Sequence, residues 1–232
     1  MLVSLLAVGA AIVAIVTLTQ SALRSGTSSA RPSVVATGLV TPSTAIPDVL
    51  ADGATLGRPD APVTLEVWSD YQCPYCGELA RNYLPRVARD FVAPGEVRIV
   101  AQDIAFLDRG VSHESTDAAT AAACAADQDQ FWAFHDLLMW NQAGENRGAF
   151  APSHLEAMAQ RLGLDTNAWN ACRLAPRTAR ALTDRVATAG TLGIGSTPTL
   201  VIDGRAIVGL PPSYDALASA LRAALATKPS AP

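Results

Sequence analysis

Two cysteines separated by a proline and a tyrosine, Cys73-Pro74-Tyr75-Cys76, carry the clearest chemistry in this chain. They follow an apolar, strand-like run at 63–68 and precede a helical stretch that begins near Gly77. Two thiols at the first turn of a helix can close a small disulfide and reopen it by thiol exchange. The spacing therefore predicts a reaction centre rather than a structural staple.

The expected helix start gives the two thiols different properties. Unpaired backbone N–H groups and the positive end of the helix dipole stabilise an anion on the first sulfur, so we expect Cys73 to be an acidic, exposed nucleophile. Pro74 suits the first helical position, where its missing N–H has no partner to lose. Cys76, one turn further, is expected to be the buried resolving thiol. The redox-active disulfide needs no other cofactor.

A structural zinc site is the alternative use of a CxxC pair. Such a site usually needs a second pair of ligands at similarly close spacing. The other cysteines and histidines are scattered singly along the chain, at Cys124, Cys172, His113, His135 and His154. We therefore predict no metal site.

The chain has 232 residues, half of them apolar, which suits one globular domain with a tail or two small domains. Its formal net charge is −4, and charged residues are sparse rather than clustered. Without a basic field, nucleic acid is not expected as a partner.

An apolar run at 2–18 is broken only by Ser4, Gly9 and Thr17, and as a helix it would span roughly 25 Å. We predict that 1–20 is a transmembrane anchor or signal, and whether it is cleaved stays open. Basic residues follow the run rather than precede it, which by itself favours a cytoplasmic domain. The cysteine pair outweighs this signal, and we predict a single-pass protein of the bacterial cell membrane with its catalytic domain extracytoplasmic.

The remaining chain divides into a linker, a split domain and a tail. Residues 21–50 are rich in Ser, Thr, Ala and Pro and predict a flexible linker. Strand-like runs at 63–68 and 96–101 flank the CxxC helix, which runs towards Phe91 with Pro85 as a possible kink. The other predicted parts are a first thioredoxin-like part at 51–110, a helical insertion at 111–193, a second thioredoxin-like part at 194–228 and a tail at 229–232.

Helical periodicity dominates the insertion, where Ser153 and Asp165 are expected N-caps. The second part reads as a hairpin of 199–202 and 205–208, turning at Asp203-Gly204, followed by a last helix. A strand-helix-strand unit, a helical insert and a hairpin with a helix predict an α/β, thioredoxin-like fold with an inserted all-helical domain.

Four stretches resemble the DsbA-like thiol:disulfide oxidoreductases and occur in that family's order: Asp60-Ala61-Pro62-Val63-Thr64, Ser69-Asp70-Tyr71-Gln72-Cys73-Pro74-Tyr75-Cys76, Phe131-Trp132-Ala133-Phe134-His135-Asp136 and Gly195-Ser196-Thr197-Pro198-Thr199. The resemblance implies that Pro198 is a cis proline facing the active-site disulfide. It also implies that Thr197 presents its backbone to an extended substrate chain beside Pro74 and Tyr75.

One position departs from that family's pattern, and the dipeptide between the cysteines does not decide between oxidase and reductase. Many members carry a buried Glu six positions before the first cysteine, where Val67 stands here. Strand alternation places the neighbouring Glu66 on the opposite face, so the proton acceptor for Cys76 is not identified. The Pro74-Tyr75 dipeptide also occurs in reducing glutaredoxins and does not fix the direction of the chemistry.

Cys124 and Cys172 both fall in the predicted insertion. In an oxidising compartment, two remaining cysteines suggest a second bond, worth at most about 4 kcal/mol for so long a loop. Two buried free thiols are the alternative. Some extracytoplasmic relatives have a disulfide in the insertion, and we predict the structural disulfide Cys124–Cys172.

These features predict an extracytoplasmic thiol:disulfide oxidoreductase that oxidises client cysteines through Cys73 and Cys76. The expected partners are unfolded or reduced client proteins and a DsbB-like or quinone-linked membrane oxidase. A tethered reductase or isomerase is the alternative. Isomerases of this kind commonly use a dimerisation domain, and the stretch between the tether and Pro62 is too short to supply one, which counts against the isomerase. We expect a monomer. A non-catalytic envelope domain that binds metal or protein is the remaining hypothesis.

Overall fold

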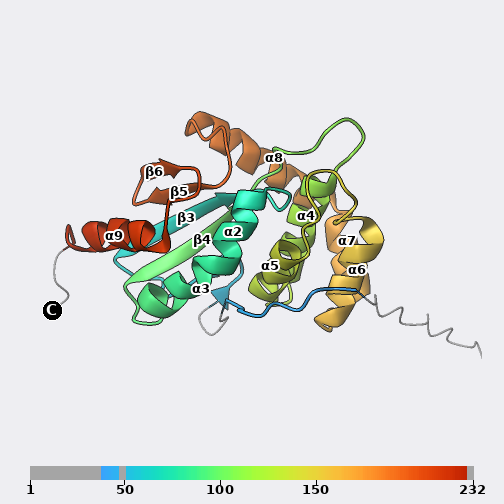
Figure 1. Ribbon diagram of the computed structural model, residues 1–232. Helices are drawn as coiled ribbons and strands as arrows, with labels where there is room; N and C mark the ends of the chain where they lie inside the picture. The colour runs from blue at the N-terminus through green and yellow to red at the C-terminus, as the bar shows by residue number, and fades with distance from the viewer. Residues whose placement is uncertain (1–37, 47–50, 229–232) are drawn as a thin grey trace, which may run out of the picture. The chain divides into compact units, whose positions relative to one another are not determined.

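A six-stranded sheet organises the part of the chain described by the computed structural model, which covers residues 38–46 and 51–228. The strand order across the sheet is β1-β2-β4-β3-β5-β6 (Figure 1). The strands are β1 (Ala51–Asp52), β2 (Thr55–Leu56), β3 (Val63–Ser69), β4 (Val97–Asp103), β5 (Thr199–Ile202) and β6 (Arg205–Val208).

The central strand β3 positions the CxxC, because the chain passes directly from it into the active-site turn. It lies parallel to β4, with Val63 opposite Val97 and Ser69 opposite Asp103, and antiparallel to β5. Val63, Leu65 and Val67 are buried in the main core, whereas Trp68 packs in a second core on the other face. The sheet is therefore buried on both faces at its centre, as parallel pairing requires.

Helices cover the two faces. The CxxC helix α2 (Pro74–Asn82), the short α3 (Leu84–Val87), the π-helical turn η1 (Ala88–Val92) and α9 (Tyr214–Leu225) contribute to the main core. The helix after the CxxC is interrupted just before Pro85, because a proline inside a helix lacks the N–H and its ring clashes with the preceding turn. On the other face, Ala189 of α8 (Pro176–Thr191) packs with Trp68.

The other helices between β4 and β5 form a group to one side of α2 (Figure 1). They are α4 (Glu114–Ala126), α5 (Phe131–Trp140), α6 (Pro152–Arg161) and α7 (Thr166–Arg173). Asp165 caps α7, since its side chain accepts from the backbone N–H groups of Asn167 and Ala168. The expected cap at Ser153 is wrong: the N-cap of α6 is Ala151, two residues earlier, because Pro152 occupies the first helical position.

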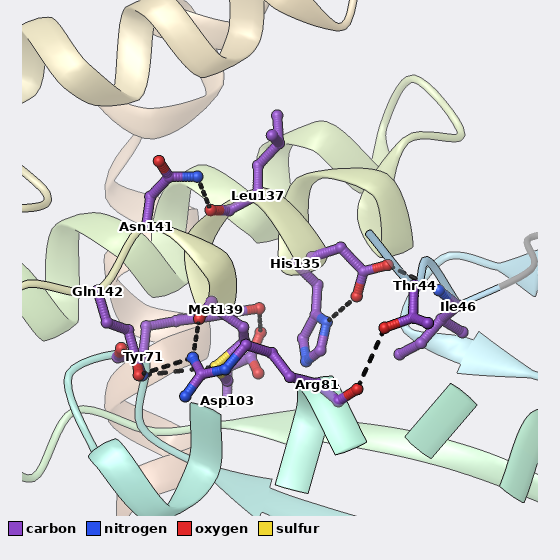
Figure 2. Close-up of polar contacts among 11 residues, drawn as sticks. Thr44, Ile46, Tyr71, Arg81, Asp103, His135, Leu137, Met139, Asn141 and Gln142 are labelled. Carbon is purple, nitrogen blue, oxygen red and sulfur yellow. Dashed lines mark hydrogen bonds and ion pairs between the residues drawn. The ribbon is translucent and has the colours of Figure 1, made fainter. Parts of the chain in front are cut away.

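Part of the predicted flexible linker is packed against the domain, so that prediction is wrong for residues 38–46. Asn141 exchanges two hydrogen bonds with the backbone of Val40, at 2.7 and 3.0 Å. The Ile46 N–H donates to Asp136 at 2.7 Å (Figure 2). Polar side chains at α5 thus pair with the backbone of a segment whose own composition predicted no order.

No helix within 38–46 or 51–228 is long and apolar enough to cross a membrane. The predicted anchor at 1–20 lies outside the described residues, as do 21–37 and 47–50 of the predicted linker and the tail at 229–232.

Candidate active site

Cys73 lies at the N-cap of α2, with Pro74 at the first helical position. The Cys73 N–H donates to the Asp70 carbonyl at 3.0 Å, and the Cys73 carbonyl accepts from the Gly77 N–H at 3.1 Å. The tight turn after β3 therefore delivers the first sulfur to the helix start, where backbone N–H groups have no helical acceptor.

The buried carboxylate of Asp70 orders this turn. It accepts hydrogen bonds from the Gln72 N–H at 2.9 Å and the Ser115 hydroxyl at 2.6 Å. Its other oxygen accepts from the backbone N–H groups of Phe106 and Leu107 at 2.8 and 3.0 Å. Burial raises the pKa of Asp70, and these donors oppose that rise. One side chain thus joins the CxxC turn to α4 and to the loop after β4.

The Cys73 thiol is acidified by its surroundings. Its pKa is lowered to about 6, first because the Cys76 thiol donates to it and then because the Thr197 side chain and the N–H groups of Cys76 and Tyr75 do so. Burial opposes this effect. Cys73 is therefore largely a thiolate at neutral pH, the form that attacks disulfides and leaves them.

Cys76 has the opposite character. Its pKa is raised well above the ordinary value, first by burial and then by the Cys73 sulfur. Only 1% of the residue is exposed. Both cysteines are free thiols in the structure, so the pair is described in its reduced form.

The expected exposed nucleophile is more enclosed than we predicted, because only 5% of Cys73 is accessible. Its sulfur lies 3.4 Å from the Thr197 carbonyl, which covers one side. Access is through a surface cavity of about 480 Å³ lined by Cys73, Pro74, Tyr75, Phe106, Leu107, Arg109, Glu145, Gly195, Ser196 and Thr197. Tyr75 is 63% exposed at its rim.

The predicted substrate-side residues converge on this cavity. The Thr197–Pro198 peptide bond is cis. Pro198 is buried, and its carbonyl accepts from the Gly209 N–H at 2.8 Å. The contact of the Thr197 carbonyl with the Cys73 sulfur places the loop before β5 against the start of α2, although 124 positions separate the two residues in sequence.

Residues that the sequence did not single out surround the turn. The Tyr71 hydroxyl donates to Asp103 at 2.9 Å, and burial raises the pKa of Asp103 (Figure 2). Gln142, beyond α5, donates to the carbonyls of Tyr71 and Cys73. No motif distinguishes Gln142, and its position six residues after Asp136 is the one signal that points near it.

Two predicted non-participants lie apart from the sulfurs. Glu66 accepts from the Trp68 indole N–H at 3.0 Å, on the face of β3 opposite the cysteine core, as alternation predicted. His135 is buried beside Asp136 at 3.3 Å, with its ring edge-on to Tyr71. Trp68 therefore binds Glu66, and Asp136 and Tyr71 contact His135, so both residues have structural partners away from the sulfurs.

The structure joins Cys124 and Cys172 by a disulfide that links α4 to α7 within the insertion. Within the described ranges, no three His, Cys, Asp or Glu side chains are grouped to hold a metal ion.

An acidic thiol at a helix start, a buried partner one turn later and a facing Thr-Pro loop on a βαβ frame define a class of protein: a thioredoxin-like fold built for dithiol–disulfide exchange.

A sequence profile of the thioredoxin family matches residues 50–223, and the chain belongs to that family. The Na(+)/H(+) antiporter NhaA 3 of Salinispora tropica is 33% identical over 171 residues, which are 74% of this chain and 24% of the antiporter. Disulfide bond formation protein D of Bacillus subtilis is 30% identical over 105 residues, 45% of this chain and 46% of that protein. The chain thus spans a quarter to a half of the length of these curated relatives.

Solved structures agree with this assignment. The structure of a thioredoxin-like oxidoreductase from Silicibacter pomeroyi has a TM-score of 0.62 and 27% identity, covering 75% of this chain and 92% of that one. The predicted thioredoxin-like fold is confirmed. The predicted DsbA-like resemblance and enzyme class, thiol:disulfide oxidoreductase, agree with the names of these similar proteins.

Proposed function

We propose that this protein is an extracytoplasmic thiol:disulfide oxidase that transfers the Cys73–Cys76 disulfide to the cysteines of reduced client proteins. The observation that carries the proposal is the contrast in position between the two thiols. Cys73 lies at the N-cap of α2 with its pKa lowered to about 6, whereas Cys76 is buried, which raises its pKa. A stabilised thiolate favours the reduced pair, and a pair that favours its reduced form oxidises others.

The exchange proceeds in two steps. A client thiolate attacks the Cys73 sulfur of the disulfide, a client–Cys73 bond forms, and the Cys76 sulfur leaves and takes up a proton. A second client thiolate then attacks the client sulfur of this mixed disulfide and expels Cys73 as a thiolate. The client loses two electrons, the pair gains them, and the low pKa of Cys73 makes it the better leaving group.

The gain from thiolate stabilisation can be bounded. With a pKa of about 6 instead of 9.0, ionisation at pH 7 stabilises the reduced pair by at most about 1.4 kcal/mol, because one pH unit above the pKa is one decade. For a two-electron couple this is about 30 mV. Ionisation of Cys73 therefore raises the reduction potential of the pair and makes it more oxidising. This contribution is smaller than the difference of about 150 mV between strongly oxidising and reducing proteins.

The cavity beside Cys73 supports a polypeptide client. Aromatic and aliphatic side chains, Tyr75, Phe106 and Leu107, line it together with the Thr197 backbone. An extended client segment can place its cysteine at Cys73 while its backbone pairs with the loop that holds Thr197 and Pro198. We place the reaction at the bacterial cell membrane, with the protein tethered as a monomer and reoxidised by a DsbB-like or quinone-linked membrane oxidase.

The reduction potential of the Cys73–Cys76 pair, measured by equilibration in glutathione buffers, tests the direction. A value near about −120 mV supports the oxidase. A value near about −270 mV contradicts it and favours a tethered reductase. Trapping tests the mechanism with a client that already holds a disulfide. The Cys73 thiolate of Cys76→Ser should attack that bond, expel one client thiolate and accumulate the client–Cys73 mixed disulfide, because no Cys76 thiol is present to release it. A non-catalytic binding domain would keep its activity in Cys73→Ser.

A further inference from the structure

One side chain beyond the insertion helix α5 reaches the backbone of the active-site turn. Gln142 Nε2 donates to the Tyr71 carbonyl at 2.7 Å and to the Cys73 carbonyl at 2.9 Å. Both hydrogens of the amide are thereby used on the backbone on either side of Gln72. Figure 2 shows Gln142 and Tyr71 side by side, with the amide at the turn.

Arg81 of α2 orients this amide. Its Nη1 donates to Gln142 Oε1 at 3.3 Å and also to the Met139 carbonyl of α5 (Figure 2). A guanidinium can only donate, so it selects the amide oxygen and leaves the nitrogen for the two carbonyls. Hydrogen bonds therefore connect Arg81 of the CxxC helix to Gln142 of the insertion, and Gln142 to the CxxC turn.

The absence of a side chain at Gly77 leaves space for the Gln142 amide and the Arg81 guanidinium. A Cβ at this position would lie 2.1 Å from Gln142 Oε1 and 2.6 Å from Arg81 Nη1. Glycine inside a helix lowers its stability, and Gly77 is in the first half of α2 with no positive φ to explain it. The close approach of the amide gives a physical reason for a glycine immediately after Cys76.

We propose that Gln142 is a positioning residue that sets the reactivity of Cys73, because it fixes the backbone on both sides of Gln72 from the helical insertion. The groups that stabilise the Cys73 thiolate are directional donors, namely the Cys76 thiol, the Thr197 side chain and backbone N–H groups. They act only while the turn holds the sulfur in line with them. The inference rests on the proposed use of Cys73 as the attacking and leaving thiolate.

The test measures the Cys73 pKa from the ultraviolet absorbance of the thiolate in the reduced full-length protein. In Gln142→Ala the two carbonyls lose their shared donor and the turn relaxes, so we expect the pKa to rise by about one unit. At pH 6 this lowers the thiolate fraction, and with it the rate of alkylation by iodoacetamide, about fivefold. Gln142→Glu should shift the pKa further in the same direction, since a carboxylate cannot donate and adds a negative charge.

Gly77→Ala provides a second route to the same state, because its methyl group displaces the amide without removing it. The double variant Gly77→Ala/Gln142→Ala should shift the pKa no further than either single change, since the shorter side chain leaves space for the methyl group. This variant pair also keeps the proposal testable if Gln142→Ala alone does not fold.

Gln128→Ala is the matched control. Gln128 also clamps backbone with its amide, accepting from the Asp165 N–H at 2.8 Å and donating to the Asp165 carbonyl at 3.2 Å, but at the start of α7. Its loss should lower thermal stability and leave the Cys73 pKa and the reduction potential unchanged.

The outcomes separate the two proposals. A wild-type Cys73 pKa near its ordinary value contradicts the proposed oxidase, whatever the variants do. An unchanged pKa, alkylation rate and reduction potential in both Gln142→Ala and Gly77→Ala, with folding confirmed by thermal melting, overturns the positioning role. A shift of equal size in Gln128→Ala also overturns it, since the effect would then follow from general loosening of the insertion.

Discussion

The reduction potential of the Cys73–Cys76 pair should change its pH dependence near pH 6. The disulfide takes up two electrons, and each proton taken up with them lowers the potential by about 30 mV per pH unit. Below the Cys73 pKa of about 6 both thiols bind protons on reduction, so the slope is about 59 mV per pH unit. Above it only Cys76 binds one, because its pKa is raised, and the slope falls to about 30 mV.

The assay equilibrates the protein with reduced and oxidised glutathione from pH 5 to 8 and corrects for the two-proton couple of glutathione itself. Between pH 7 and 8 we expect a fall of about 30 mV rather than about 59 mV. A constant slope of about 59 mV across the whole range would refute the reasoning that the helix start and the Cys76 thiol hold Cys73 as an anion.

The same experiment has an internal control in Cys76→Ala, studied as a single thiol. The Cys76 thiol is the largest cause of the lowered Cys73 pKa, so its removal should raise that pKa in an absorbance titration. An unchanged value would assign the acidity to the remaining donors, namely the Thr197 side chain and the backbone N–H groups.

Four further outcomes follow from the site and its frame. The folded-state pKa of Cys73 is depressed, so the reduced protein should gain stability relative to the oxidised one as the pH rises from 5 to 7. The gain is at most about 1.4 kcal/mol, because solvent screening reduces it, and urea unfolding of both forms measures it. Replacing Cys124 and Cys172 by Ala should lower the free energy of unfolding by at most about 4 kcal/mol, checked by the same method, while the CxxC potential stays unchanged. Asp70→Asn should cost about 2–3 kcal/mol of stability, because a buried group with four donors loses its charge, and a melting temperature equal to wild type would contradict this role. Glu66→Gln should leave the reduction potential unchanged, since Glu66 lies on the face of β3 away from the sulfurs, and a shifted potential would mean that it communicates with Cys76.

The chemistry of the CxxC was predictable because its causes are local. A strand, a proline at the first helical position and two cysteines one turn apart determine where the sulfurs lie relative to the helix start. The alternation that separates Glu66 from Val67 is equally local. The fold class followed from the order of these elements.

Long-range pairing was not predictable in the same way. The enclosure of Cys73 depends on the Thr197 carbonyl, 124 positions away in sequence. The backbone of residues 38–46 is held by hydrogen bonds to the side chains of Asn141 and Asp136. Nothing in the sequence of this segment indicates those partners. Neither contact follows from composition or periodicity, because both depend on how the insertion packs.

The helical insertion therefore has a role beyond covering the sheet. Ser115 of α4 donates to Asp70 at 2.6 Å, Gln142 after α5 donates to the turn itself, and the backbone N–H of Asn146 donates to Gln72. Three separate parts of the insertion thus bind the residues that lie just before Cys73. A CxxC turn held only by its own helix could relax when the disulfide opens, whereas here the insertion keeps the geometry that stabilises the thiolate. The reactivity of the pair is in this sense a property of both parts of the domain, and variants of the insertion are the place to look for changes in potential that leave the cysteines intact.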